Sequence, residues 1–375
     1  MIFSINFLSK SVIILLIGIF CFSECAPVKK NLSESSQEIK QNLRIVVLPI
    51  ENLSGTPVPL KEIKESLRKK IEIDGLSVFE DEELEKFMAR NRVRYTGGID
   101  VVTAEAFKRE IGVDAVLITT VELYNETNPS KIALFCRLVS TGSNPIILWM
   151  DSIGLSGDDF PGILGLGLIE DPRLLMEKAT ESLSASFIRY FTGNMGTVGD
   201  KKNKKKFNPK VFYNISFLTP DSKYTVVVMP FYNDSTRRNA GEIIMLHFVN
   251  QMMKLKNYNV IEPGIIRQEL LKMRLIMNIG VSLSEADLIL NDLNADLMLS
   301  GRIMGYDDYI GSFGKAKVDF SAQLLSKSEK KVVWKSKSYN EGDDRVFLFD
   351  WGKVNTASAM ASQMVRLAVE SMAKQ

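Results

Sequence analysis

Two stretches of this chain carry the same pattern. Residues 45–54 read Ile-Val-Val-Leu-Pro-Ile-Glu-Asn-Leu-Ser, and residues 226–235 read Val-Val-Val-Met-Pro-Phe-Tyr-Asn-Asp-Ser. Downstream, residues 78–124 align with residues 260–306 without a gap, at a constant offset of 182 (260 minus 78). A repeat of about 180 residues is far longer than a solenoid unit and has the size of a whole domain. The chain therefore reads as two tandem copies of one fold.

Each copy predicts the same order of elements. An apolar strand at 44–50 or 225–231 precedes an amphipathic helix. The apolar residues of this helix recur every four positions: Ile63, Leu67 and Ile71 in the first copy, and Ile244, Phe248 and Met252 in the second. A second short strand and a second helix follow. The two strands are separated by a helix, so we expect them to be parallel, with a right-handed crossover.

The second half of each copy predicts a helix, three strands and a closing helix. Thr103 and Ser284 are the expected N-caps of the first of these helices. The strands should form an antiparallel meander that ends at Trp149 and Trp334, and the closing helices should cover 172–191 and 354–373. The expected fold class is an α/β (α+β) sandwich, with one mixed sheet in each copy.

Residues 1–25 lie outside both copies. The apolar run from Val12 to Phe22 is shorter than the roughly 20 residues that span a bilayer, and it fits the h-region of a secretory signal. Ser23-Glu24-Cys25 resembles a lipobox, although Glu24 fits that motif poorly. We expect a lipid on Cys25, with a plain cleaved signal or an uncleaved anchor as alternatives. The polar residues 26–42 should form a flexible tether to the membrane.

The composition is that of a globular protein, with 45% apolar and 25% charged residues and a net charge of +2. It does not indicate a nucleic-acid-binding surface. Residues 193–222 separate the copies and contain a lysine run at 201–206. This segment is either a solvated linker or a patch that contacts anionic lipid headgroups. We expect few contacts across the seam, so that the domains 43–192 and 223–375 each fold alone.

The sequence offers little chemistry. His247 is the single histidine and lies in an amphipathic segment, so we expect it to pack in the core. A histidine-based zinc cluster is thereby excluded, and no phosphate-binding loop of the GxxxxGK[ST] type appears. Adjacent aspartate pairs such as Asp307-Asp308 are typical of solvated loops. We therefore expect no catalytic residue, no metal and no cofactor, and hence no enzyme.

One polar feature occurs in both copies. Asn52 and Ser54 follow the first strand of copy one, and Asn233 and Ser235 follow that of copy two. Ligands of open α/β sheets tend to bind at the carboxyl ends of parallel strands, which makes these four residues candidate ligand or partner contacts. The alternative is turn chemistry, because Asn and Ser also bond to their own backbone.

These motifs resemble a known group of domains. The opening pattern, the segments at Asp114 and Asp296 and the pairs Leu148-Trp149 and Val333-Trp334 resemble the TolB N-terminal-like fold and the CsgG-like and LpoB-like periplasmic lipoprotein domains. The resemblance covers about residues 43–190 and 223–372. It implies a non-catalytic accessory factor that binds envelope proteins of unknown identity. As a lipoprotein, it would lie on the periplasmic side of the outer membrane or on the cell surface. The alternative is a periplasmic small-molecule or glycan-binding protein that uses the ends of the first strands.

Overall fold

The computed structural model describes residues 43–72, 76–160, 167–193, 206–215, 222–274, 281–311, 314–346 and 352–373. The predicted signal peptide, Cys25, the tether and nearly all of the lysine run lie outside the described residues. Residues 40–375 form one compact unit that contains both copies.

The first copy folds into a six-stranded mixed sheet of order β3-β1-β4-β5-β6, with β2 paired to β4. As predicted, β1 is parallel to β3 and β4, and β4, β5 and β6 form an antiparallel meander. The strands are β1 (Leu43–Val47), β2 (Glu51–Asn52), β3 (Leu76–Val78), β4 (Ala115–Asn125), β5 (Lys131–Ser140) and β6 (Ile147–Ser156). The helices are α3 (Leu60–Ile71), α4 (Asp81–Arg90), α5 (Val101–Ala106), its π-helical continuation Phe107–Ile111, and α6 (Pro172–Phe191), with a 3-10 turn at Gly157–Asp159.

The second copy repeats this topology in a seven-stranded sheet of order β10-β8-β11-β12-β13-β7, with β9 paired to β11. Its strands are β7 (Lys210–Asn214), β8 (Tyr224–Val228), β9 (Tyr232–Asn233), β10 (Tyr258–Val260), β11 (Leu297–Asp307), β12 (Lys317–Ser326) and β13 (Lys331–Glu341). Its helices are α7 (Ala240–Met252), α8 (Pro263–Lys272), α9 (Leu283–Asp292) and α10 (Ala357–Ala373). Two α+β copies with one mixed sheet each are the predicted fold class.

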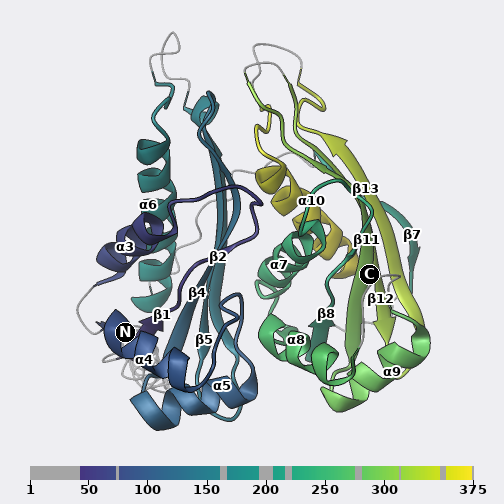
Figure 1. Ribbon diagram of the computed structural model, residues 1–375. Coiled ribbons are helices and arrows are strands. Elements are labelled where there is room, and N and C mark those ends of the chain that lie inside the picture. The colour runs from purple at the N-terminus through teal and green to yellow at the C-terminus, as the bar shows by residue number, and fades with distance from the viewer. Residues whose placement is uncertain are drawn as a thin grey trace, which may run out of the picture. The chain divides into compact units, whose positions relative to one another are not determined.

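The two copies stack as alternating layers (Figure 1). Helices α3 and α6 cover one face of the first sheet, and α7 and α10 of the second copy lie between the two sheets and contact both. The first sheet is therefore buried on both faces, and every residue of β5 from Lys131 to Val139 is buried. One hydrophobic cluster includes Phe135 of the first copy and Phe248 of the second. The prediction that few contacts cross the seam is wrong.

The helix α7 shows why the copies cannot be separated cleanly. All of its residues except Glu242 are buried, and a helix that is apolar on all sides is normally a buried one. The equivalent helix α3 keeps a charged outer face and buries only one side. Met245 of α7 stands where α3 has Lys64, so the second copy has apolar residues where the first has charged ones.

The predicted linker 193–222 is in part structured. Phe207 is fully buried, and residues 210–214 form β7, which pairs antiparallel with β13 at the edge of the second sheet. Lys206 donates to the carbonyl oxygens of Gly342 (3.0 Å) and Gly352 (2.8 Å). The segment 206–215 therefore belongs to the second copy.

Two smaller predictions are also wrong. The third helices begin earlier than expected, with Asp100 and Ser282 as N-caps in place of Thr103 and Ser284. The strand that carries Trp149 does not end there, because it continues to Ser156 and pairs with β5, for example Asp151 with Cys136. The backbone of residues 150–156 thus completes the sheet.

Candidate functional site

A buried ion pair joins the copies at the middle of β5. The Arg137 guanidinium donates from Nε to Oε2 of Glu262 at 3.1 Å and from Nη2 to Oε1 at 2.9 Å. The two side chains are 1% and 0% exposed. Nη2 also donates to the carbonyl oxygen of Gly97. Glu262 is the N-cap residue of α8, so the pair fixes that helix against the first sheet.

A second buried polar group lies further along the seam, around Glu122 of β4. Its carboxylate accepts from the hydroxyls of Tyr306 and Ser358 (2.7 Å), and Nε2 of His247 lies 3.5 Å from Oε2. Burial raises the pKa of Glu122, but the nearby His247 ring and the hydrogen bonds from Tyr306 and Ser358 outweigh it and hold that pKa below its usual range. The imidazole is fully buried and packs edge-on against Phe135, so His247 lies in the core, as predicted.

The predicted contact residues form the same turn in both copies. The Asn52 Oδ1 accepts from the backbone N–H (2.9 Å) and the hydroxyl (2.6 Å) of Ser54. The Asn233 Oδ1 accepts in the same way from Ser235, at 3.0 and 2.6 Å. The amide groups of both asparagines donate to carbonyl oxygens four residues on, so these side chains hold their own turns.

The structure brings these two turns together through Arg237, a residue that the sequence did not single out. Its guanidinium extends from the second turn and donates to the carbonyl oxygens of Ser54 and Glu122 in the first copy. Asn239 adds a bond to the carbonyl oxygen of Leu53 at 3.3 Å. The ends of the two first strands therefore meet at the seam.

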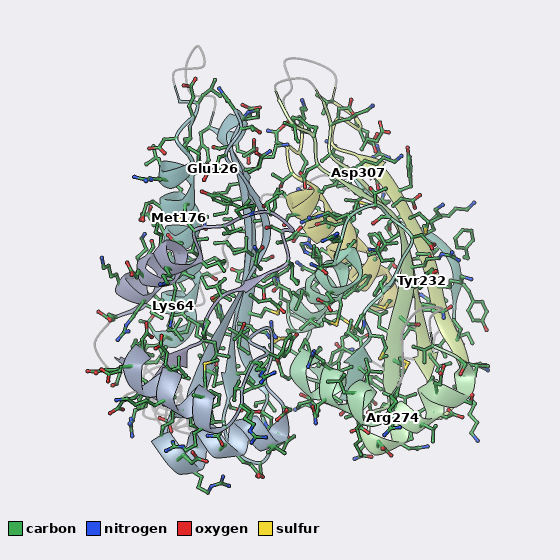
Figure 2. The ribbon with its side chains drawn as sticks, in the orientation of Figure 1. Lys64, Glu126, Met176, Tyr232, Arg274 and Asp307 are labelled. Atoms are coloured by element: carbon green, nitrogen blue, oxygen red, sulfur yellow. The ribbon has the colours of Figure 1, made fainter. Side chains whose placement is uncertain are left out.

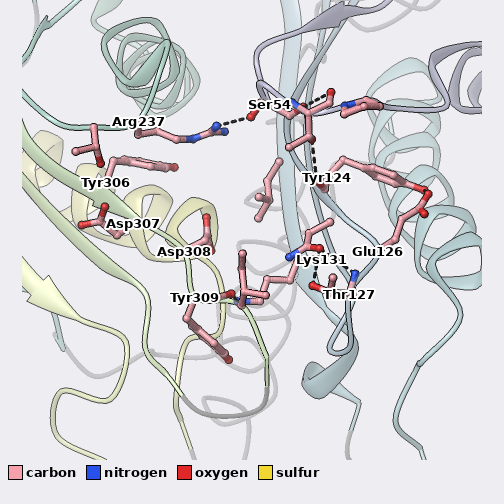
Figure 3. A pocket seen from close by; sticks show the side chains of 16 residues that line it. Ser54, Tyr124, Glu126, Thr127, Lys131, Arg237, Tyr306, Asp307, Asp308 and Tyr309 are labelled. Atoms are coloured by element: carbon pink, nitrogen blue, oxygen red, sulfur yellow. Dashed lines mark hydrogen bonds between the residues drawn. The ribbon is translucent and has the colours of Figure 1, made fainter.

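A cavity of about 640 Å³ opens beside this meeting point (Figure 3). Ser54, Tyr124, Glu126 and Lys131 line it from the first copy, and Arg237, Tyr306, Asp307, Asp308 and Tyr309 line it from the second. Glu126 and Asp307 lie at the same end of the two sheets (Figure 2). Ser54 is the predicted contact residue that reaches this cavity, whereas Asn233 lines a separate one beside Glu242.

The charged groups of this cavity are partly bonded to protein. The buried Lys131 donates to the carbonyl oxygen of Tyr309 at 2.8 Å and lies 3.2 Å from the centre of the Tyr309 ring. Burial lowers the pKa of Lys131 to about 8. Burial also raises the pKa of Asp308 to about 6, although its carboxylate accepts from the backbone N–H of Ala357 at the start of α10. The cavity thus offers tyrosine rings, hydroxyls and carboxylates to a polar ligand.

The described residues contain no cluster of three or more metal-ligating side chains. In the same part of the chain, no helix is long and apolar enough to cross a membrane. Cys136 is a free, buried thiol whose pKa burial raises to about 12, so it is not available as a nucleophile.

A different kind of site is the face of the second sheet that points away from α7 and α10. Helices α8 and α9 cover only one end of this face, where Met298 and Leu325 pack with them. Beyond that end, the aligned rows across β11, β12, β13 and β7 are Ser300, Gln323, Lys335 and Tyr213, and then Arg302, Ser321, Lys337 and Lys210. No helix of the described residues packs on these rows.

The equivalent rows of the first sheet make the interface between the copies. They are Ile118, Arg137 and Met150, and then Thr120, Phe135 and Ser152. Arg137 binds Glu262, Phe135 contacts His247, and the Ser152 hydroxyl oxygen accepts from Asn250 at 3.0 Å. The same face of the fold is thus a buried protein interface in copy one and a polar open surface in copy two.

The edge strand β7 borders this open face. All five of its residues are exposed, among them Phe212 (55%) and Tyr213 (45%). In the described part of the chain, β13 is the strand that pairs with β7, so β7 forms an edge of the second sheet. Figure 1 shows β7 at the outer side of the second sheet.

The sequence contains a pattern that indicates the charged residues of the seam. Strand β5 reads Lys-Ile-Ala-Leu-Phe-Cys-Arg-Leu-Val-Ser, a nearly unbroken apolar run, whereas β12 alternates polar and apolar residues. A continuous apolar run indicates a strand buried on both faces. An arginine within it, and a glutamate within β4, then require buried partners.

Comparisons with known proteins place these findings in context. No protein-family model matches the chain, and no curated protein matches it. A PelC dodecamer from Paraburkholderia phytofirmans is similar at 15% identity and a TM-score of 0.31, over 45% of this chain and 99% of that chain. Lipoprotein GNA1162 from Neisseria meningitidis is similar at 26% identity and a TM-score of 0.27, over 30% of this chain and 79% of that chain.

The LpoB C-terminal domain from Salmonella enterica is also similar, at 12% identity and a TM-score of 0.26, over 33% of this chain and 86% of that chain. The sequence resemblance to TolB and CsgG stays a prediction.

Proposed function

We propose that the protein is an exported, membrane-tethered lipoprotein that binds a partner protein in the cell envelope and catalyses no reaction. One observation carries this proposal. The face of the first sheet that holds α7 and α10 has an open equivalent in the second sheet. The fold therefore already binds protein with this face inside the chain, and the second copy leaves it free for a partner.

The chemistry of the open face defines the partner. Lys335 has no ion-pair partner among the described residues. The Lys337 Nζ lies 3.6 Å from Oδ1 of Asp319, and the Arg302 guanidinium forms an ion pair with Asp234. The Arg302 guanidinium also stacks on Tyr232, 5.0 Å from the ring centre. The surplus of cations beside an exposed strand edge fits an acidic segment that adds a strand to β7. A polar surface of this kind suits a reversible partner rather than a permanent one.

Site-specific photo-crosslinking in cells tests this surface. A photoreactive residue at Phe212 or Tyr339 should give the same covalent adduct with an acidic protein. The same probe at Val102, which is 74% exposed on α5, should give none. Lys335→Glu combined with Lys337→Glu should abolish the adduct at Phe212. An adduct that survives this charge reversal would refute the open face as the binding surface.

The tether is the second part of the proposal and rests on Ser23-Glu24-Cys25. Cells fed a fatty-acid analogue should label the wild-type protein and leave Cys25→Ala unlabelled. Unlabelled wild-type protein would contradict acylation and leave the binding surface to be judged on the crosslinks alone.

A second function is favoured by the cavity of about 640 Å³ at the ends of the first strands. Its tyrosines and carboxylates suit a small hydroxylated or cationic molecule such as a glycan unit. A ligand that raises the melting temperature of wild-type protein, but not that of Asp307→Asn, would establish it. A screen in which every ligand that raises the melting temperature acts equally on Asp307→Asn would oppose it.

A further inference from the structure

A second opening lies at the end of the seam where α5 and α8 are found (Figure 1). It is a groove of about 570 Å³ to which both copies contribute. Arg92, Arg94 and Tyr95 line it from the segment after α4, and Arg267 and Gln268 line it from α8. Neither copy forms this groove alone.

The backbones of the two copies touch at the floor of the groove. A Cβ atom placed on Gly98 would lie 2.8 Å from Cα of Gly264, and one placed on Gly264 would lie 2.4 Å from the backbone nitrogen of Ile99. Only glycine allows this approach. The contact fixes the distance between the arginines of the first copy and Arg267 of the second.

The groove carries an excess of positive charge. Arg92, Arg94 and Arg267 are exposed, and none forms an ion pair in the described part of the chain. Asp100 is the one carboxylate among the lining residues, and its Oδ1 accepts from the backbone N–H of Thr103 at 2.7 Å as the cap of α5. The lining therefore contains three guanidinium groups and one carboxylate, which caps a helix.

Tyr95 orients Arg267, and the backbone of Arg92 has an unusual conformation. The Arg267 guanidinium stacks on the Tyr95 ring, 4.1 Å from its centre. Arg267 also lines an adjoining cavity together with Glu51 and Glu242. Arg92 has a φ of 54°, a left-handed conformation that costs a non-glycine residue on the order of 1 kcal/mol.

We propose that this groove binds an anion with phosphate groups, held by Arg92 and Arg94 of the first copy and Arg267 of the second. Guanidinium groups match phosphate oxygens with paired hydrogen bonds, and three of them can neutralise more than one negative charge. The site is independent of the open sheet face, since it lies on the first copy and α8. The phosphate belongs either to a soluble ester or to a lipid headgroup.

Calorimetric titration of the full chain with inorganic tripolyphosphate tests the site. Arg92→Gln combined with Arg94→Gln should weaken binding by about tenfold or more, the loss expected for two charge-assisted contacts. Lys61→Gln combined with Lys69→Gln, at exposed positions of α3, changes the net charge equally and should leave the affinity within about twofold of wild type. Equal weakening in both double variants, or in neither, would overturn the proposal.

The contribution of the second copy has its own test. Arg267→Gln should weaken tripolyphosphate binding by itself, with an unchanged melting temperature in the absence of ligand. Full binding by Arg267→Gln would overturn the assignment to the seam.

Vesicles distinguish the two sources of phosphate. The chain carrying Cys25→Ala, which lacks the acylated cysteine, is sedimented with phosphatidylcholine vesicles that do or do not contain phosphatidylglycerol. Cosedimentation with the anionic vesicles supports the site with a lipid headgroup as the source of phosphate, provided that tripolyphosphate abolishes it and the Arg92 and Arg94 double variant lacks it. Tripolyphosphate binding without cosedimentation supports it with a soluble ester. Cosedimentation that the double variant retains in full would contradict the groove as the anion site.

Discussion

The buried ion pair between Arg137 and Glu262 gives the sharpest energetic prediction. Glu262→Gln leaves a guanidinium that is 1% exposed and cannot release its proton, with the Gly97 carbonyl oxygen as its remaining bonded partner. Breaking a buried pair by removing one partner costs about 3–5 kcal/mol of unfolding free energy. Arg137→Gln should cost less, about 1–3 kcal/mol, because the remaining carboxylate still accepts from the Gly264 N–H.

A double-mutant cycle separates the pair from its surroundings. Gln is also the residue at the equivalent position of the second copy, Gln323. The double variant Arg137→Gln with Glu262→Gln leaves no charge at either of these two positions and should lose about 0.5–3 kcal/mol less than the sum of the single variants. Urea unfolding followed by tryptophan fluorescence gives the free energies from the midpoints and slopes.

The matched control is Glu177→Gln, which removes the exposed ion pair of Glu177 with Lys70 inside the first copy. Exposed pairs contribute about 0–1 kcal/mol. An unfolding free energy of Glu262→Gln within about 0.5 kcal/mol of the wild-type value, as for a surface substitution, would refute the predicted cost of breaking the pair.

Three further predictions concern the seam. Because the folded pKa of Glu122 is lowered, its ionised carboxylate stabilises the fold fully above the ordinary pKa of 4.5, and this stabilisation is lost as the pH falls through the lower folded pKa. Glu122→Gln should therefore flatten the acid side of a plot of unfolding free energy against pH. Asp308 has the opposite sign: its pKa of about 6, against an ordinary 3.8, makes the fold less stable as the pH rises between these values. The decrease in unfolding free energy is below about 3 kcal/mol because the Asp308 side chain is partly accessible. Asp308→Asn should remove this pH dependence, and a decrease that persists in the variant would disprove the assignment. Gly264→Ala should lower the unfolding free energy by about 1–3 kcal/mol, because its Cβ would lie 2.4 Å from the backbone nitrogen of Ile99. Gly305→Ala is the control and should be tolerated, because the nearest atom to its Cβ would be 3.6 Å away. Equal melting temperatures of the two variants would contradict the close approach at Gly264.

The elements of each copy could be predicted from local patterns. The helix stripe Ile63, Leu67 and Ile71 is buried in α3, and Pro172 and Phe191 bound α6 as expected. These features depend on periodicity and on helix-terminus residues within one segment, so a single sequence contains them. The N-caps were missed by two or three residues because several Ser, Thr and Asp residues compete near each helix start.

The seam could not be predicted in the same way. Its contacts join residues more than a hundred positions apart, such as Arg137 and Glu262, and no local pattern relates them. The repeat itself misled, since two similar copies suggest two independent cores. What distinguishes the copies is the chemistry of one sheet face, with Phe135 on one and Ser321 on the other, which becomes visible only when the strands are aligned.

We expect the two copies to unfold as one unit, because α7 and α10 pack against both sheets. Trp149 and Trp334 are buried, one in each sheet, and report on the copies separately. Urea unfolding is followed in two single-tryptophan variants, Trp334→Phe with Trp351→Phe and Trp149→Phe with Trp351→Phe. Coincident midpoints and slopes are predicted, because α7 and α10 belong to the cores of both sheets. Two separate transitions, with one copy still folded after the other has unfolded, would contradict the account.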